Sequence, residues 1–187
     1  MPSPSSVGCN RCSYMPGGFP DSSLGEGGID VQRRSRCGYA FLMNGGCFAA
    51  RTTIATGVST SSAMAEVKGL HYCVTEAMAI IQTFIQLKMT LKQAVPIFED
   101  NQACINIMTI SSNASSSRHI EVKYFYCQEL MERGLIDLRK ISTEFELGDG
   151  FTKALPAHTY LAHRDHLQGL SQYSQEERAA LYARVTM

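Results

Sequence analysis

The amino-acid sequence predicts an α/β fold, in which helices pack on a sheet, and three observations carry this prediction. Apolar residues recur every three or four positions after residue 62, which is the spacing of one helix face. An Asn-Gly pair at 44–45 separates two short apolar runs, as in a hairpin of two strands. Further apolar runs at 95–99 and 135–141 alternate with segments of helical spacing, which favours a sheet covered by helices.

Length and composition limit the classes of protein to consider. The chain has 187 residues, of which 44% are hydrophobic, enough for one domain with a core. With 17 basic and 17 acidic residues it lacks the basic excess of a strong nucleic-acid binder, which disfavours a pure binding module more than a metal-dependent enzyme. We expect an intracellular protein with reduced thiols, because the seven cysteines are odd in number and neither a signal pattern nor a membrane span is present.

Changes in composition predict three segments. Residues 1–17 are rich in Pro, Ser, Gly and Cys and lack apolar periodicity, so we expect this N-terminal segment to be disordered. Residues 18–156 carry all the regular patterns and form the predicted domain. Residues 157–187 are polar and form a predicted C-terminal extension, in which 175–183 is compatible with a surface helix.

The predicted domain begins with its least regular strand. Gly17, Gly18 and Pro20 precede Asp21 at positions where a strand is wanted, and such residues weaken strands. The apolar run at 38–43 and the run at 47–52 then form the predicted hairpin.

A helix of about 25 residues follows the hairpin. The Ser/Thr cluster at 59–62 offers its N-cap, and its apolar face consists of residues at steps of three and four: Val67, Leu70, Val74, Met78, Ile81 and Ile85. Glu66 is predicted to lie in the first turn, where the helix dipole favours a carboxylate. The pattern alone leaves open whether Glu66 has only that role or a chemical one.

The second half of the domain repeats strand and helix. Residues 95–99 predict a buried strand that ends at Asp100, followed by a short helix. Asp100 thus stands at a strand's carboxyl end, where ligand sites collect, and could also be the helix N-cap; the two roles are compatible. Helical spacing from 120 to 131 stops before Gly134, and a strand at 135–141 follows. The last predicted element is a short helix at 144–154 that carries Asp149 and turns Leu147, Phe151 and Leu155 toward the core.

Four stretches of the chain match a known family in order and spacing: RRSRCGY at 33–39, FEDNQA at 98–103, RHIEVKY at 118–124 and GDGFTKALP at 148–156. From about residue 18 to residue 156 the chain resembles the ribonuclease H domain at the end of copia-type LTR retrotransposon Pol polyproteins. The resemblance implies a ribonuclease H-like fold, with a mixed five-stranded central sheet flanked by helices. It also implies a partner, the reverse transcriptase domain of the same element, which this chain lacks, and a location in a cytoplasmic particle or the nucleus.

The resemblance further implies a metal-dependent endonuclease that hydrolyses the RNA strand of RNA–DNA hybrids. Its metal ligands and catalytic residues would be Asp21, Glu66, Asp100 and Asp149, holding two Mg²⁺ or Mn²⁺ ions, which prefer oxygen ligands. Two alternatives remain. The protein could be an inactive remnant, since the family has two glutamates two residues apart and the first place here is Met64. The acidic residues could also be helix caps of a generic α/β interaction domain.

The family's two tryptophans are a further departure. They fall on Leu24 and Ala50 of this chain, which contains no tryptophan. Loss of two large aromatic side chains predicts cavities in the core.

Overall fold

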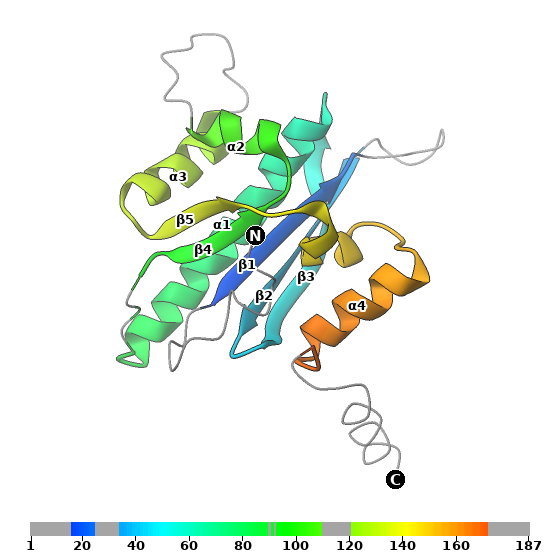
Figure 1. Cartoon of the computed structure of the whole chain (residues 1–187). Helices are drawn as coiled ribbons and strands as arrows, with labels where there is room; N and C mark the ends of the chain where they lie inside the picture. The colour runs from blue at the N-terminus through cyan, green and yellow to red at the C-terminus, as the bar shows by residue number, and fades with distance from the viewer. Residues whose placement is uncertain (1–15, 25–33, 90, 92, 110–120, 172–187) are drawn as a thin grey trace.

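The computed structural model describes residues 16–24, 34–89, 91, 93–109 and 121–171 and contains a five-stranded sheet in the order β3-β2-β1-β4-β5 (Figure 1). The strands are β1 Gly17–Ser23, β2 Arg34–Met43, β3 Gly46–Val58, β4 Val95–Glu99 and β5 Ile136–Lys140. The pairs β1–β2 and β2–β3 are antiparallel, whereas β1–β4 and β4–β5 are parallel. The predicted mixed five-stranded sheet is confirmed.

The predicted hairpin is present, with Asn44 at φ 53° and Gly45 at φ 84°. Two-residue hairpin turns need such positive φ values, which explains the Asn-Gly pair. Both strands are longer than their apolar runs, because pairing continues as far as Arg34 opposite Val58. Arg34 and Val58 are exposed, and exposed and buried residues alternate over 34–37, so no continuous apolar run marks the strand ends.

The first strand is regular despite its glycines and proline, and it occupies the centre of the sheet. A Cβ at Gly18 would lie 2.8 Å from side-chain carbons of Ile97 and Phe41 and 2.9 Å from the Cys73 sulfur. Gly18 therefore reflects close packing between strands and α1. Gly17, assigned to the predicted disordered segment, belongs to β1, and residues 1–15 lie outside the described residues.

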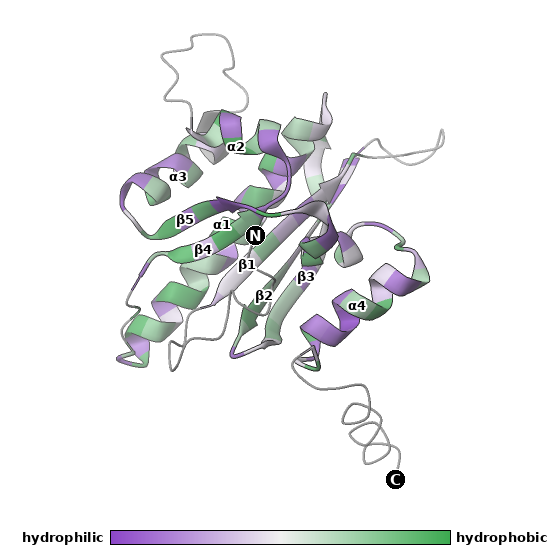
Figure 2. Cartoon of the chain, viewed as in Figure 1, coloured by the Kyte–Doolittle hydropathy of each residue, from purple (hydrophilic) through white to green (hydrophobic). Residues whose placement is uncertain are grey.

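Helix α1, Ser62–Gln86, covers one face of the sheet (Figure 1). Its N-cap is Ser61, whose hydroxyl accepts a hydrogen bond from the Met64 N–H at 3.2 Å, as the Ser/Thr cluster predicts. The predicted apolar face packs in the main core except at its end, where Ile85 is 60% exposed. Figure 2 shows that apolar residues predominate along α1 and β4, whereas α4, Ala157–Leu167, has a mixed surface.

Two further helices, α2 Gln102–Thr109 and α3 Glu121–Glu132, pack beside α1. The end of α3 is as predicted: Gly134 has φ 66°, and the Leu135 N–H donates to the Leu130 carbonyl at 3.0 Å. The start predicted for this helix, at residues 118–120, lies outside the described residues, as does the surface helix proposed at 175–183.

The prediction of a single helix at 144–154 is wrong. The structure has two 3₁₀-helices instead, η2 Thr143–Phe145 and η3 Leu147–Phe151. The tighter turn no longer aligns residues four apart, so Leu147 is buried while Phe151 and Leu155 are only half-buried. Gly148 permits this arrangement, because a Cβ there would lie 2.8 Å from the Asp21 nitrogen and the Phe19 oxygen.

The missing tryptophans leave no cavity in the core at the two positions where the family has them. Leu24 is 44% exposed and Ala50 is also exposed, so neither side chain belongs to the core. Core volume is therefore not lost by having small or aliphatic residues there.

Candidate active site

Acidic residues from three elements, and one that directly follows a fourth, lie around the central strand β1. Asp21 belongs to β1, Glu66 to α1 and Asp149 to η3, whereas Asp100 directly follows β4. Because β1 and β4 are parallel neighbours, their carboxyl ends lie at the same edge of the sheet.

Two glycines bring α1 and η3 against the backbone of Asp21. A Cβ at Gly69 of α1 would lie 2.9 Å from the Asp21 carbonyl oxygen, and a Cβ at Gly148 of η3 would lie 2.8 Å from the Asp21 nitrogen. Larger side chains would force both elements away. Glu66 precedes Gly69 by less than one helical turn and Asp149 adjoins Gly148, so this close packing places their carboxylates beside Asp21.

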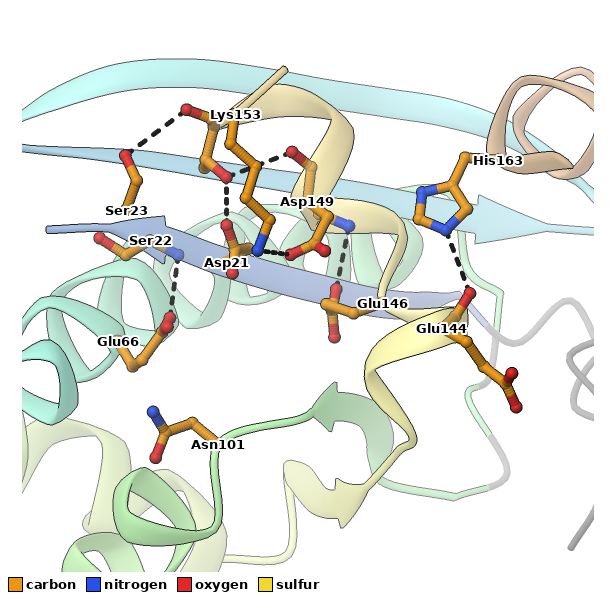
Figure 3. A network of polar contacts seen from close by, with 12 residues as sticks. Asp21, Ser22, Ser23, Glu66, Asn101, Glu144, Glu146, Asp149, Lys153 and His163 are labelled. Carbon is orange, nitrogen blue, oxygen red and sulfur yellow. Dashed lines mark hydrogen bonds and ion pairs between the residues drawn. The ribbon is translucent and has the colours of Figure 1, made fainter. Parts of the chain in front are cut away.

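Asp21 and Asp149 form the η3 side of the site (Figure 3). Asp21 is 3% exposed, and its Oδ2 accepts a hydrogen bond from the Thr152 hydroxyl. The Lys153 Nζ lies 2.7 Å from the Asp149 Oδ1. Burial raises the pKa of Asp149, the hydrogen bond and charge of Lys153 lower it, and Asp21 raises it, with a net value of about 6.

Glu66 forms the α1 side of the site. It is 9% exposed, and its Oε2 accepts a hydrogen bond from the Ser22 N–H at 2.9 Å (Figure 3). Burial and the charges of Asp21, Glu99 and Asp100 raise the pKa of Glu66 to about 9. The prediction that Glu66 lies in the first turn is wrong, because it is the fifth residue of α1 and the first turn holds no acidic residue.

Asp100 is half-buried in the connection between β4 and α2. The cap of α2 is its neighbour Asn101, whose side-chain oxygen accepts a hydrogen bond from the Cys104 N–H at 3.0 Å. The alternative in which Asp100 is the helix cap is therefore wrong. The charge of Asp100 contributes to the raised pKa values of Glu66 and Glu99, and its carbonyl accepts a hydrogen bond from Lys140.

Two further acidic residues, which no sequence pattern singled out, lie near the site and interact with its carboxylates. Glu99 and Glu146 have no exposed surface. Each accepts one backbone hydrogen bond, Glu99 from Asn101 at 3.0 Å and Glu146 from Gly148 at 2.9 Å, and each has an Oε2 without a partner. Burial raises the pKa of Glu99 to about 8 and that of Glu146 well above its usual range. The signal that could have identified them in the sequence is a glutamate directly next to a large apolar residue, Phe98 or Leu147.

The residues present fit a hard divalent cation by their chemistry, because the donors are carboxylate oxygens and those of Asp21, Glu66 and Asp149 belong to buried residues. Within the described ranges, no group of three or more His, Cys, Asp or Glu side chains is arranged to hold a metal ion. A single ligand set made of Asp21, Glu66, Asp100 and Asp149 thus stays a prediction.

The C-terminal extension, which the sequence predicts to be polar, contributes one buried histidine. His163 of α4 is 3% exposed, and its Nε2 lies 3.2 Å from the Glu144 carbonyl oxygen of η2 (Figure 3). This contact fixes α4 against η2.

Comparison with solved structures defines the class of fold. The chain is similar to the N-terminal ribonuclease H domain of a Mycobacterium tuberculosis protein, with a TM-score of 0.51 and 11% identity over 82% of this chain and 98% of that chain. It is also similar to ribonuclease H1 from Halobacterium salinarum, with a TM-score of 0.52 and 12% identity over 79% and 98% of the two chains. The fold is therefore that of ribonuclease H, as predicted.

A sequence relative narrows the class further. The chain is 26% identical over 146 residues to a retrovirus-related Pol polyprotein from transposon TNT 1-94 of Nicotiana tabacum, which covers 76% of this chain and 10% of the polyprotein. No family model matches the chain. The predicted resemblance to a retrotransposon Pol polyprotein is confirmed, and the chain has the ribonuclease H fold. The chain spans about a tenth of the relative's length.

Within the part of the chain that the structure describes, no helix has the length and apolar character needed to cross a bilayer.

Proposed function

We propose that this chain is the ribonuclease H domain of a copia-type Pol polyprotein and that it hydrolyses the RNA strand of RNA–DNA hybrids with two Mg²⁺ or Mn²⁺ ions. One observation carries the proposal: on a ribonuclease H sheet, Gly69 and Gly148 bring α1 and η3, with Glu66 and Asp149, against the backbone of Asp21. A fold that needed only stability would not gather carboxylates in this way, because they repel one another.

In this proposal Asp21, Glu66, Asp100 and Asp149 would hold the metal ions. The bound ions would supply an activated water and stabilise the 3′-oxygen leaving group. The protein's own part is to orient its ligands before the ions arrive. The Thr152 hydroxyl orients Asp21, and the Ser22 N–H orients Glu66. The hydrogen bond from the Ser22 N–H ties Glu66 to β1 next to Asp21. Met64 lies in the first turn of α1, so we assign the ligand position to Glu66.

The proposed partners follow from the same reaction. Selectivity for RNA would come from contacts with 2′-hydroxyl groups in the wide minor groove of the hybrid. The reverse transcriptase domain of the same element would supply the hybrid, in a cytoplasmic particle or the nucleus. We place the catalytic domain at 18–156 and treat 157–187 as an extension, whose helix α4 contacts η2 through His163.

The test is cleavage of a hybrid labelled on both strands. Purified protein with Mg²⁺ or Mn²⁺ should cut the RNA strand, leave the DNA strand whole and stop when EDTA is added. Asp100→Asn should lose the activity, and Glu129→Gln, an exposed change on α3, should keep it. Cleavage that persists in EDTA would contradict the proposal.

The second candidate is an inactive remnant, and Met64 is the observation that favours it. Met64→Glu restores the glutamate found at this place in the family. Cleavage that appears only in Met64→Glu would show that the natural protein is inactive and that Glu66 is not the ligand. An equal rate in both proteins would show that Glu66 suffices.

A further inference from the structure

Lys153 lies at the rim of the acidic site and has no part in the proposed reaction. Its Nζ is 2.7 Å from the Asp149 Oδ1. The two partners differ in burial: the Asp149 side chain is 6% exposed, whereas the Lys153 side chain is 45% exposed. The Lys153 side chain is thus partly open to water while its ammonium lies beside the buried Asp149 carboxylate (Figure 3).

We infer that Lys153 is a tethered counter-ion, which holds Asp149 in the metal-free protein and must leave Asp149 before a divalent cation can bind there. The metal half of this inference rests on the proposed function. The counter-ion half does not, because it concerns the metal-free protein alone.

The carboxylates explain why a counter-ion is needed. Asp21, Asp100 and Asp149 all favour the charged ammonium: burial lowers the pKa of Lys153, these three residues raise it more, and the net shift is upward. Without the ammonium, Asp149 would lose its ion pair with Lys153 in a largely buried position, with the Asp21 carboxylate beside it. Removing one partner of such a pair destabilises the folded protein because it leaves the other charge uncompensated.

The backbone explains how the ammonium can leave without disturbing the site. The Lys153 N–H donates to the Asp149 carbonyl at 3.1 Å, and the Thr152 N–H donates to the same oxygen at 3.2 Å. The main chain is therefore fixed, and the flexible four-carbon stem of lysine alone has to move. Thr152 is the contrasting neighbour, because it is 3% exposed and its short side chain stays on Asp21.

The experiment compares Lys153→Met with Lys153→Arg and with Arg133→Met. Arg133 is the matched control, because it pairs with Glu129 at the same spacing of four residues but on the exposed surface of α3. In EDTA, Lys153→Met should lower the melting temperature by about 2–4 °C, Arg133→Met should change it by less than about 1 °C, and Lys153→Arg should stay close to wild type. Mn²⁺ affinity, measured by electron paramagnetic resonance of the free ion, should rise about fivefold in Lys153→Met.

The outcomes separate this inference from the proposed function. An unchanged melting temperature of Lys153→Met in EDTA, or weaker Mn²⁺ binding by it, would overturn the inference. Binding of Mn²⁺ only by Lys153→Met would support it strongly. If neither protein binds Mn²⁺, the proposed metal-dependent function fails and so does the competition, while the melting temperature in EDTA still decides whether Lys153 is a counter-ion.

Discussion

The two sides of the acidic site differ in how their charge is compensated. On the η3 side, Asp149 is paired with Lys153 and Asp21 accepts a hydroxyl hydrogen bond, and the pKa of Asp149 is about 6. On the α1 and β4 side, Glu66 accepts a single backbone hydrogen bond and Glu99 has an oxygen without a partner. There burial raises the pKa values to about 9 for Glu66 and about 8 for Glu99.

This difference assigns distinct tasks to the two sides. Near neutral pH Asp149 is ionised and paired with Lys153, whereas Glu66 and Glu99 hold their protons in the metal-free protein. A cation that binds Glu66 must therefore displace a proton, so its affinity depends on pH. The metal-free fold avoids part of the carboxylate repulsion because Glu66 and Glu99 stay protonated near neutral pH.

The largest expected effect is the pH dependence of metal-free stability. Carboxyl groups whose pKa is raised on folding bind more protons when folded, so stability is highest near the unfolded pKa of 4.5 and is lost as pH rises toward about 8 to 9. Each fully shifted group contributes up to about 1.4 kcal/mol per pH unit. The melting temperature in EDTA should fall clearly between pH 5.5 and pH 8.5.

Mg²⁺ at millimolar concentration should reduce this fall, because it binds the ionised carboxylates of the folded protein only. Asp100→Asn should abolish the gain from Mg²⁺. A melting temperature in EDTA that rises with pH would contradict the comparison between the two sides.

Glu66→Gln should separate activity from stability. The amide oxygen can still accept the Ser22 hydrogen bond, but the charge that would hold a cation is gone. We expect hybrid cleavage to fall by about 10²–10³-fold, while the melting temperature in EDTA at pH 8.5 stays the same or rises. Calorimetry and the cleavage assay measure the two properties independently. A variant that is both active and destabilised would place Glu66 outside the metal ligands.

These contrasts also show what the sequence could predict. The hairpin at 44–45, the α1 helix and the carboxyl-end position of Asp100 followed from local rules of turn geometry and apolar spacing. The 3₁₀ form of η3 did not, because it depends on a contact between Gly148 and the distant Asp21 backbone. Glu146 and His163 were missed for the same reason, since burial of a polar side chain is decided by elements that are far apart in the sequence.

Gly148→Ala tests whether close packing holds η3 against β1. The added Cβ would meet the backbone of Asp21 and Phe19 at 2.8 Å, and backbone cannot easily yield. We expect a loss of about 1–3 kcal/mol in the free energy of unfolding, measured with urea. Gly46→Ala is the control, because no atom lies within 4 Å of its added Cβ. Equal stability of the two variants would show that Gly148 does not set the position of η3.

Glu146→Gln should have the smallest effect, and its sign tests whether Glu146 is a neutral acid. The amide oxygen can still accept the Gly148 N–H, and an amide resembles a protonated carboxyl in shape and charge. At pH 5, close to the usual pKa of a glutamate, we therefore expect the free energy of unfolding to change by less than about 1 kcal/mol. At pH 8.5 it should rise, because the raised pKa of the natural carboxyl no longer costs stability. Glu146→Leu is the companion variant: it leaves the Gly148 N–H without an acceptor and should cost about 1–3 kcal/mol at both pH values. Strong destabilisation by Glu146→Gln at pH 5 would mean that Glu146 is ionised in the folded protein, which would contradict its assignment as a neutral acid.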